Sequence, residues 1–81
     1  MKSSKDIKIT HRNMARKIFV PGTIFTYRNR TFIVEKIENN MIVCRDMLLN
    51  KEGKLDLTIN TTYFDLCAFI GDYIYLIKEG N

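Results

Sequence analysis

The sequence predicts a mainly β protein with one small domain. Segments rich in β-branched and aromatic residues recur between residues 23 and 78, and Asn or Gly residues separate them. A chain of 81 residues is long enough for a single core only. A bent sheet of about five short strands, with one short helix before the last strand, describes a small SH3-like barrel; an OB-like barrel is the alternative.

Residues 1–20 are predicted to form a basic N-terminal arm that is partly ordered, and residues 21–81 a single small β-barrel domain. In the arm, residues 7–10 alternate between apolar and polar side chains as a short strand would, and Met14 and Ile18 have helical spacing. Pro21 ends this short helix, because the residue before a proline disfavours the helical conformation. We expect residues 1–12 to lie outside the core.

Short turns in the body of the sequence predict consecutive hairpins. Asn29, the pair Asn39 and Asn40, and Gly53 are typical of such turns because these residues tolerate a positive φ. The strands that they separate are expected at residues 23–28, 31–38, 41–48 and 54–59, with a last strand at 73–78. The alternation within these strands predicts a core that contains Phe32, Val34, Ile42, Leu57 and Leu76.

The segment between the last two strands allows two interpretations. Thr62 and Asp65 have the spacing of a capping box, and Gly71 stands where a glycine would end a helix, so a helix is expected over residues 63–70. The alternative is a further strand through residues 64–69.

Charge is distributed unevenly along the chain. The net charge of +4 combines +7 over residues 1–30 with −3 over residues 31–81. A basic segment on a mildly acidic body is typical of proteins that bind a polyanion, such as DNA or RNA, or an acidic protein surface. No apolar segment approaches the ~20 residues of a membrane span, so we expect a cytoplasmic protein without a membrane partner.

The sequence does not predict an enzyme. The single histidine, His11, lies in the predicted arm, and Cys44 and Cys67 lie in apolar segments that favour buried, reduced thiols. One histidine and two distant cysteines do not supply a metal site. The four glycines are isolated from one another, so no phosphate-binding loop is predicted. We therefore expect no metal and no cofactor.

Two groups of residues are predicted to bind partners. Residues 25–32 place two arginines at a hairpin tip between aromatic residues, where guanidinium groups can pair with phosphates and rings can stack on bases. Tyr73 and Tyr75 share one face of the last strand and are predicted to form a protein interface. The residues predicted to bind nucleic acid are Lys5, Lys8, Arg12, Arg16, Lys17, Tyr27, Arg28 and Arg30.

These observations predict a small binding protein without enzymatic activity, a nucleic-acid-binding accessory protein. The alternative is a protein-binding inhibitor, such as an anti-defence (anti-CRISPR-like) protein that blocks a host nuclease by binding its acidic or nucleic-acid-binding surface. Ile, Lys and Asn supply 26 of the 81 residues, a bias of AT-rich genomes that favours a phage or mobile-element origin for either function.

Overall fold

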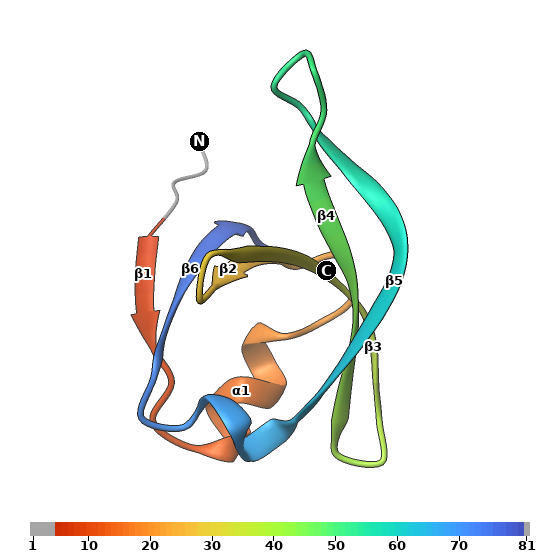
Figure 1. Ribbon diagram of the computed structural model, residues 1–81. Coiled ribbons are helices and arrows are strands. Elements are labelled where there is room, and N and C mark those ends of the chain that lie inside the picture. Colours follow the sequence, from red (N-terminus) through yellow and green to blue (C-terminus); the bar gives the residue numbers. More distant parts are fainter. Residues whose placement is uncertain (1–4, 81) are drawn as a thin grey trace.

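The computed structural model describes residues 5–80, which form one antiparallel sheet of six strands and two short helices (Figure 1). The strand order is β1-β6-β2-β3-β4-β5, so β1 and β5 form the two edges of an open sheet. The predicted mainly β class is confirmed. Along the chain the elements are β1 (Lys5–Lys8), α1 (Arg12–Ile18), β2 (Ile24–Tyr27), β3 (Arg30–Glu38), β4 (Met41–Leu49), β5 (Leu55–Asp65), the 3-10 helix η1 (Leu66–Phe69) and β6 (Tyr73–Lys78).

The hairpin turns lie where the sequence predicts them. Arg28 and Asn29 have φ angles of 51° and 67°, and Asn39 and Asn40 have φ angles of 52° and 65°. Two consecutive residues with positive φ suit a two-residue hairpin because they match the twist of the flanking strands. Gly53, with φ of 81°, supplies the same freedom in the longer turn between β4 and β5. Strands β2 to β5 are therefore neighbours in the sheet in chain order.

Residues 62–70 extend a strand and then form a single helical turn. The predicted helix over residues 63–70 is wrong, because β5 continues to Asp65; the alternative strand is correct only for its first two residues. The Asp65 carboxylate accepts a hydrogen bond from the Cys67 amide (2.8 Å) and so caps η1. Three residues per turn place Leu66 and Phe69 on the same side of η1, and both are buried.

The core lies on one face of the sheet, under α1 and η1. The rings of Phe19, Phe25 and Phe69 pack against one another with centroid distances of 4.8 to 5.7 Å, and edge-on contacts among aromatic rings add to the burial of their area. Four of the predicted core residues are confirmed as buried, namely Phe32, Val34, Ile42 and Leu76.

The N-terminal segment is part of this core. Strand β1 pairs with β6, and Ile9, Ala15 and Phe19 are completely buried. The Ile9 amide donates to the Asp72 carbonyl (3.0 Å), and the Gly71 amide donates to the Ile9 carbonyl (2.8 Å). The expectation that residues 1–12 lie outside the core is therefore wrong for Ile9. Residues 1–4 of the predicted arm, and Asn81, lie outside the described residues.

The hairpin of β4 and β5 extends beyond the rest of the sheet (Figure 1). The predicted burial of Leu57 is wrong: its side chain is 56% exposed, and that of Ile59 is 94% exposed. The apolar residues of β5 do alternate, but no element within residues 5–80 covers this part of the edge strand. A bulge also interrupts the pairing here, because Arg45 faces Thr61 and Met47 faces Leu57, which leaves residues 58–60 opposite one residue of β4.

The two cysteines are free thiols in different environments. Cys44 is buried on the core side of β4, as predicted. The predicted burial of Cys67 is wrong: this residue is exposed, because η1 turns Leu66 and Phe69 inward and Cys67 outward. Burial, with smaller contributions from the carboxylates of Asp46 and Glu35, raises the pKa of the Cys44 thiol to about 12.

Ile9→Ala should destabilise the protein by about 2–5 kcal/mol, because it leaves a cavity at a fully buried position. Leu57→Ala removes a similar side chain from an exposed position and is the matched control, with an expected loss below ~1 kcal/mol. Denaturant melts of both variants measure the difference. Equal losses would contradict the burial of the N-terminal segment.

The two thiols should react at different rates. A thiol reagent at mildly alkaline pH should modify Cys67 rapidly in the native protein, whereas Cys44 should react only when the protein unfolds, because its thiol is buried and stays protonated. Cys67→Ser and Cys44→Ser variants assign the two phases. Rapid native labelling of the Cys67→Ser variant would contradict the placement of Cys44.

Stability should also fall at alkaline pH because of Cys44. The unfolded thiol ionises near pH 8.5, whereas the folded thiol has a raised pKa, so the unfolded state loses a proton first. This contribution to stability is complete below about pH 8.5 and declines by up to ~1.4 kcal/mol per pH unit as the pH rises toward the folded pKa. The decline of stability with pH, measured by denaturant melts, should be shallower in Cys44→Ala than in the wild type. An unchanged slope would contradict the raised pKa.

Candidate nucleic-acid interface

Five basic residues near the N-terminus are exposed, two on β1 and three on α1. Lys5 and Lys8 lie on opposite faces of β1, because their cross-strand partners are the buried Leu76 and the exposed Tyr73. Within residues 5–80, no carboxylate oxygen lies within 4.0 Å of the charged groups of these five residues. Arg16 donates a hydrogen bond to the Asn40 side-chain oxygen (3.0 Å), which connects α1 to the turn between β3 and β4 without neutralising the charge. We call this set the N-terminal basic surface; it consists of Lys5 and Lys8 on β1 and Arg12, Arg16 and Lys17 on α1.

The local sequence explains why α1 carries these charges outward. Nδ1 of His11 accepts a hydrogen bond from the Met14 amide (3.2 Å). The only histidine of the sequence therefore caps the N-terminus of α1. Ala15 faces the core, which directs Arg16 and Lys17 toward solvent. Both lie in the last helical turn, where the exposed carbonyl groups favour positive charge.

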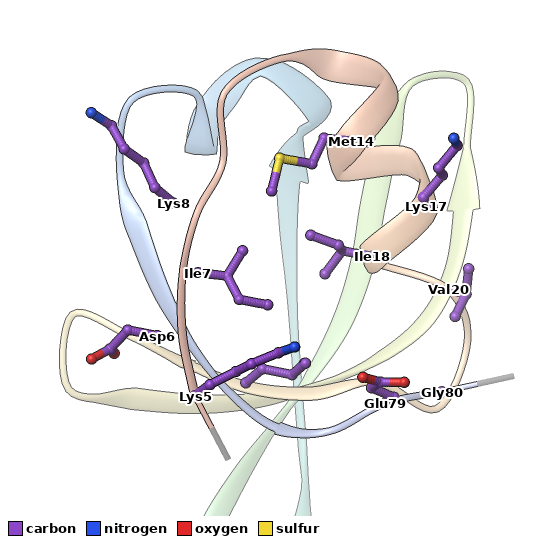
Figure 2. A pocket seen from close by; sticks show the side chains of 11 residues that line it. Lys5, Asp6, Ile7, Lys8, Met14, Lys17, Ile18, Val20, Glu79 and Gly80 are labelled. Atoms are coloured by element: carbon purple, nitrogen blue, oxygen red, sulfur yellow. The ribbon is translucent and has the colours of Figure 1, made fainter. Parts of the chain in front are cut away.

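A groove of about 610 Å³ separates β1 from α1 (Figure 2). Ile7, Met14 and Ile18 point into it and form an apolar floor, and Lys5 and Lys17 lie along its sides. The residues that follow β6, Glu79 and Gly80, close its end. The two lysines therefore come from different elements and border one hollow in the surface.

The two arginines of the hairpin between β2 and β3 differ from this surface because acidic residues accompany both. Arg30 forms an ion pair and hydrogen bond with the Asp46 carboxylate, and its guanidinium lies 5.1 Å from the centre of the Phe32 ring. Arg28 lies 3.9 Å from the Asp72 carboxylate and keeps a side chain that is 76% exposed. Much of the charge predicted at the hairpin tip is therefore balanced within the protein.

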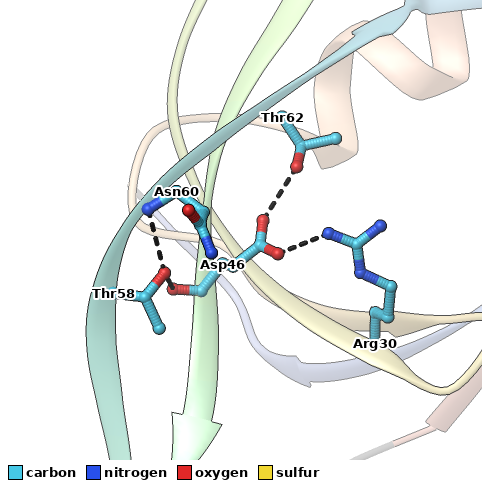
Figure 3. Close-up of polar contacts among 5 residues, drawn as sticks. All are labelled: Arg30, Asp46, Thr58, Asn60 and Thr62. Atoms are coloured by element: carbon cyan, nitrogen blue, oxygen red, sulfur yellow. Dashed lines mark hydrogen bonds and ion pairs between the residues drawn. The ribbon is translucent and has the colours of Figure 1, made fainter.

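The Asp46 carboxylate is part of a polar network that connects β3, β4 and β5 (Figure 3). It accepts hydrogen bonds from Arg30 and from the Thr62 hydroxyl (2.8 Å). The Asp46 carbonyl accepts from the Thr58 hydroxyl (3.0 Å), which in turn accepts from the Asn60 amide (3.1 Å). Arg30 therefore helps to hold β3 against β4 through Asp46. The sequence alone does not reveal this ion pair, because the two residues are 16 positions apart.

Tyr27 is a core residue with a polar end rather than a free stacking surface. Its ring packs against Phe69 and Phe64, at centroid distances of 4.7 and 6.1 Å. Its hydroxyl donates a hydrogen bond to Asp72 (2.6 Å), and this bond, together with burial, raises the pKa of Tyr27. Tyr27 is therefore partly buried and held by contacts with the core, unlike the more exposed Tyr73 and Tyr75.

Tyr73 and Tyr75 point away from the core. Their side chains are 62% and 43% exposed, whereas Ile74 and Leu76, which alternate with them on β6, are buried. Lys8 is the cross-strand partner of Tyr73, and its ammonium nitrogen lies 5.9 Å from the centre of the Tyr73 ring. The exposed pair predicted from the sequence is therefore present, and it adjoins the N-terminal basic surface.

A second exposed feature is apolar. The projecting hairpin carries several large apolar side chains that are exposed to solvent on its two faces, and large exposed apolar groups are characteristic of interaction surfaces. The sequence contains the signal for this feature in the alternation of β5, which predicts a buried strand and not an exposed one. We call this set the β4–β5 apolar patch; it consists of Leu48, Leu49, Leu57 and Ile59.

The part of the chain that the structure describes contains no group of three or more His, Cys, Asp or Glu side chains arranged to hold a metal ion. No helix within residues 5–80 has the length and apolar character that crossing a membrane requires.

The candidate interface therefore combines the N-terminal basic surface with an adjoining pair of exposed tyrosines. No known family model matches this sequence, and no curated protein and no solved structure matches the chain.

Proposed function

We propose that this protein is a non-enzymatic, cytoplasmic binding protein that binds nucleic acid through the N-terminal basic surface. The observation that supports the proposal is the set of five exposed basic side chains without a carboxylate partner within residues 5–80. Phosphate groups would supply the missing negative charge and release condensed counterions, which favours association. Within this proposal, the sheet has the form of an SH3-like barrel except that its edge strands, β1 and β5, do not pair with each other.

The proposal assigns different weights to the basic residues predicted from the sequence. Lys5, Lys8 and Lys17 have no carboxylate oxygen within 4.0 Å among residues 5–80, although Glu79 lines the same groove as these lysines. Arg30, in contrast, would have to leave Asp46 before it could pair with a phosphate. Arg28 stands between these cases, because it is largely exposed and its distance to Asp72 is long. The binding energy is therefore assigned mainly to β1 and α1.

The β4–β5 apolar patch supports a second candidate function, an inhibitor that binds a protein. In this case the N-terminal basic surface would face an acidic surface of the partner, such as the groove of a host nuclease, and the patch would supply apolar area that a nucleic acid does not need. This alternative requires no affinity for DNA or RNA.

A salt titration tests the proposed function. If all five basic groups contact phosphates of a duplex, the logarithm of the binding constant should fall with the logarithm of the salt concentration at a slope near −4.5. Lys5→Gln/Lys8→Gln/Lys17→Gln should weaken binding and reduce the magnitude of that slope by about 2.7, because about 0.9 counterion is released per contact. Mobility-shift titrations at several salt concentrations measure both quantities.

Lys36→Gln/Lys51→Gln/Lys54→Gln is the matched control, because it removes the same charge from exposed positions on β3 and near the β4–β5 turn. This control should keep the slope of the wild type. Equal loss in both triple variants would show an effect of net charge alone and contradict the assigned surface. Failure to shift single-stranded and double-stranded probes at low salt would contradict nucleic-acid binding and favour the inhibitor.

A further inference from the structure

The outer face of the sheet presents two aromatic rings that no described element covers. Helices α1 and η1 pack on the opposite face, where Ile74 joins the core with Phe19 and Phe69. Tyr73 and Tyr75 are therefore held in place by a buried strand while their rings remain exposed. Exposed tyrosines on a rigid strand are suited to stacking because few rotamers are lost when a ring or base binds.

The spacing of the two rings favours single-stranded over double-stranded nucleic acid. Side chains two residues apart on a strand lie about 6.6 Å apart, which is about twice the 3.4 Å rise between neighbouring bases in a duplex strand. Two successive bases that stack on Tyr73 and Tyr75 must therefore be separated from each other. A single strand permits this separation, whereas base pairing and stacking in a duplex oppose it.

Basic residues lie on the two segments that flank β6, namely β1 and the turn after β2. Lys8 on β1 places its ammonium group over the Tyr73 ring, 5.9 Å from the ring centre, so one face of this ring already meets a cation. Arg28 lies over the Tyr27 ring, 5.2 Å from its centre, and 3.9 Å from the carboxylate of Asp72, the residue before Tyr73. The Asp72 carboxylate also accepts the Tyr27 hydroxyl, so its charge is partly satisfied within the protein. A phosphate backbone that follows the rings would meet Lys8 directly, and the largely exposed Arg28 side chain would reach it by leaving Asp72.

One acidic group opposes this arrangement. Asp6 is the cross-strand partner of Tyr75 and is exposed, so it lies close to the same face as the two rings. A phosphate near Tyr75 would be repelled by this carboxylate. Asp6→Asn should therefore strengthen single-strand binding.

We propose that Tyr73 and Tyr75 form a stacking site for two successive bases of single-stranded nucleic acid, with Lys8 and Arg28 as phosphate contacts. This inference rests on the proposed function, since it concerns the same interface, and it specifies which form of nucleic acid binds and through which groups. Stacking is tolerant of sequence because every base has an aromatic face.

The test compares a fluorescein-labelled oligothymidylate of about 12 nucleotides with a duplex of the same length, a size within the range that single-strand binding domains cover. Fluorescence anisotropy at low salt should show tighter binding to the single strand. Tyr73→Leu/Tyr75→Leu should weaken single-strand binding by about tenfold or more and leave duplex binding almost unchanged, because stacking contributes to the single-strand complex only.

Two variants serve as controls. Tyr63→Leu removes a ring from β5 that is as exposed as Tyr73, at 62%, and should bind as the wild type does. Tyr73→Phe/Tyr75→Phe retains the stacking faces and should retain most of the affinity. The protein contains four tyrosines and no tryptophan, so quenching of the tyrosine emission by unlabelled oligonucleotide reports on stacking directly and should be lost in the double Leu variant. Thermal melts followed by circular dichroism confirm that each variant is folded.

The outcomes separate this inference from the proposed function. If the wild type binds both probes equally and the double Leu variant matches it, the stacking site is overturned while nucleic-acid binding stands. The same result would assign the exposed tyrosines to another partner, such as a protein. If Tyr63→Leu weakens binding as much as the double variant, the effect is not specific to β6 and the stacking site is again overturned. Absence of binding to both probes overturns the site together with the proposed function.

Discussion

Packing of phenylalanine rings against one face of the sheet is the interaction on which the rest of the structure depends. Phe19, which directly follows α1, and Phe69 from η1 meet Phe25 and Phe32 from the sheet, and the resulting cluster orients both helices. A chain of 81 residues supplies enough structure to cover that face and little more. The opposite face and the edges remain in contact with solvent and carry Tyr73, Tyr75 and the β4–β5 apolar patch, whereas Arg12, Arg16 and Lys17 lie on the exposed side of α1.

Local signals in the sequence predict most of the backbone path. Asn39, Asn40 and Gly53 identify turns because few other residues adopt positive φ without strain, and this preference does not depend on distant residues. Burial is harder to predict, because it depends on what covers each face. Leu57 has the alternation of a core strand but lies on a projecting edge, and Ile9 lies in a basic segment but fills the core.

The sequence predicts which basic residues belong to the candidate interface, but not which of them lie near a carboxylate. The excess of positive charge in residues 1–30 is visible in the sequence. Which of these charges remain without a carboxylate partner depends on pairs that join distant segments, such as Arg30 with Asp46 and Arg28 with Asp72. Counting charges along the chain therefore overstates the net positive charge at the hairpin between β2 and β3, where both arginines lie near a carboxylate. The neighbouring positions of Lys8 and Tyr73 likewise depend on strand pairing over a long range.

The bulge in β5 fixes the alignment of the projecting hairpin. Asp46 holds this strand at two points, through its carbonyl to Thr58 within the bulge and through its carboxylate to Thr62 beyond it. Sliding β5 by one position along β4 would break both hydrogen bonds and reverse the face that each side chain occupies. The irregular outline also interrupts the row of backbone groups that another chain would need for continuous strand pairing. A long edge strand with exposed apolar side chains therefore offers another chain no uninterrupted row of backbone groups along its length.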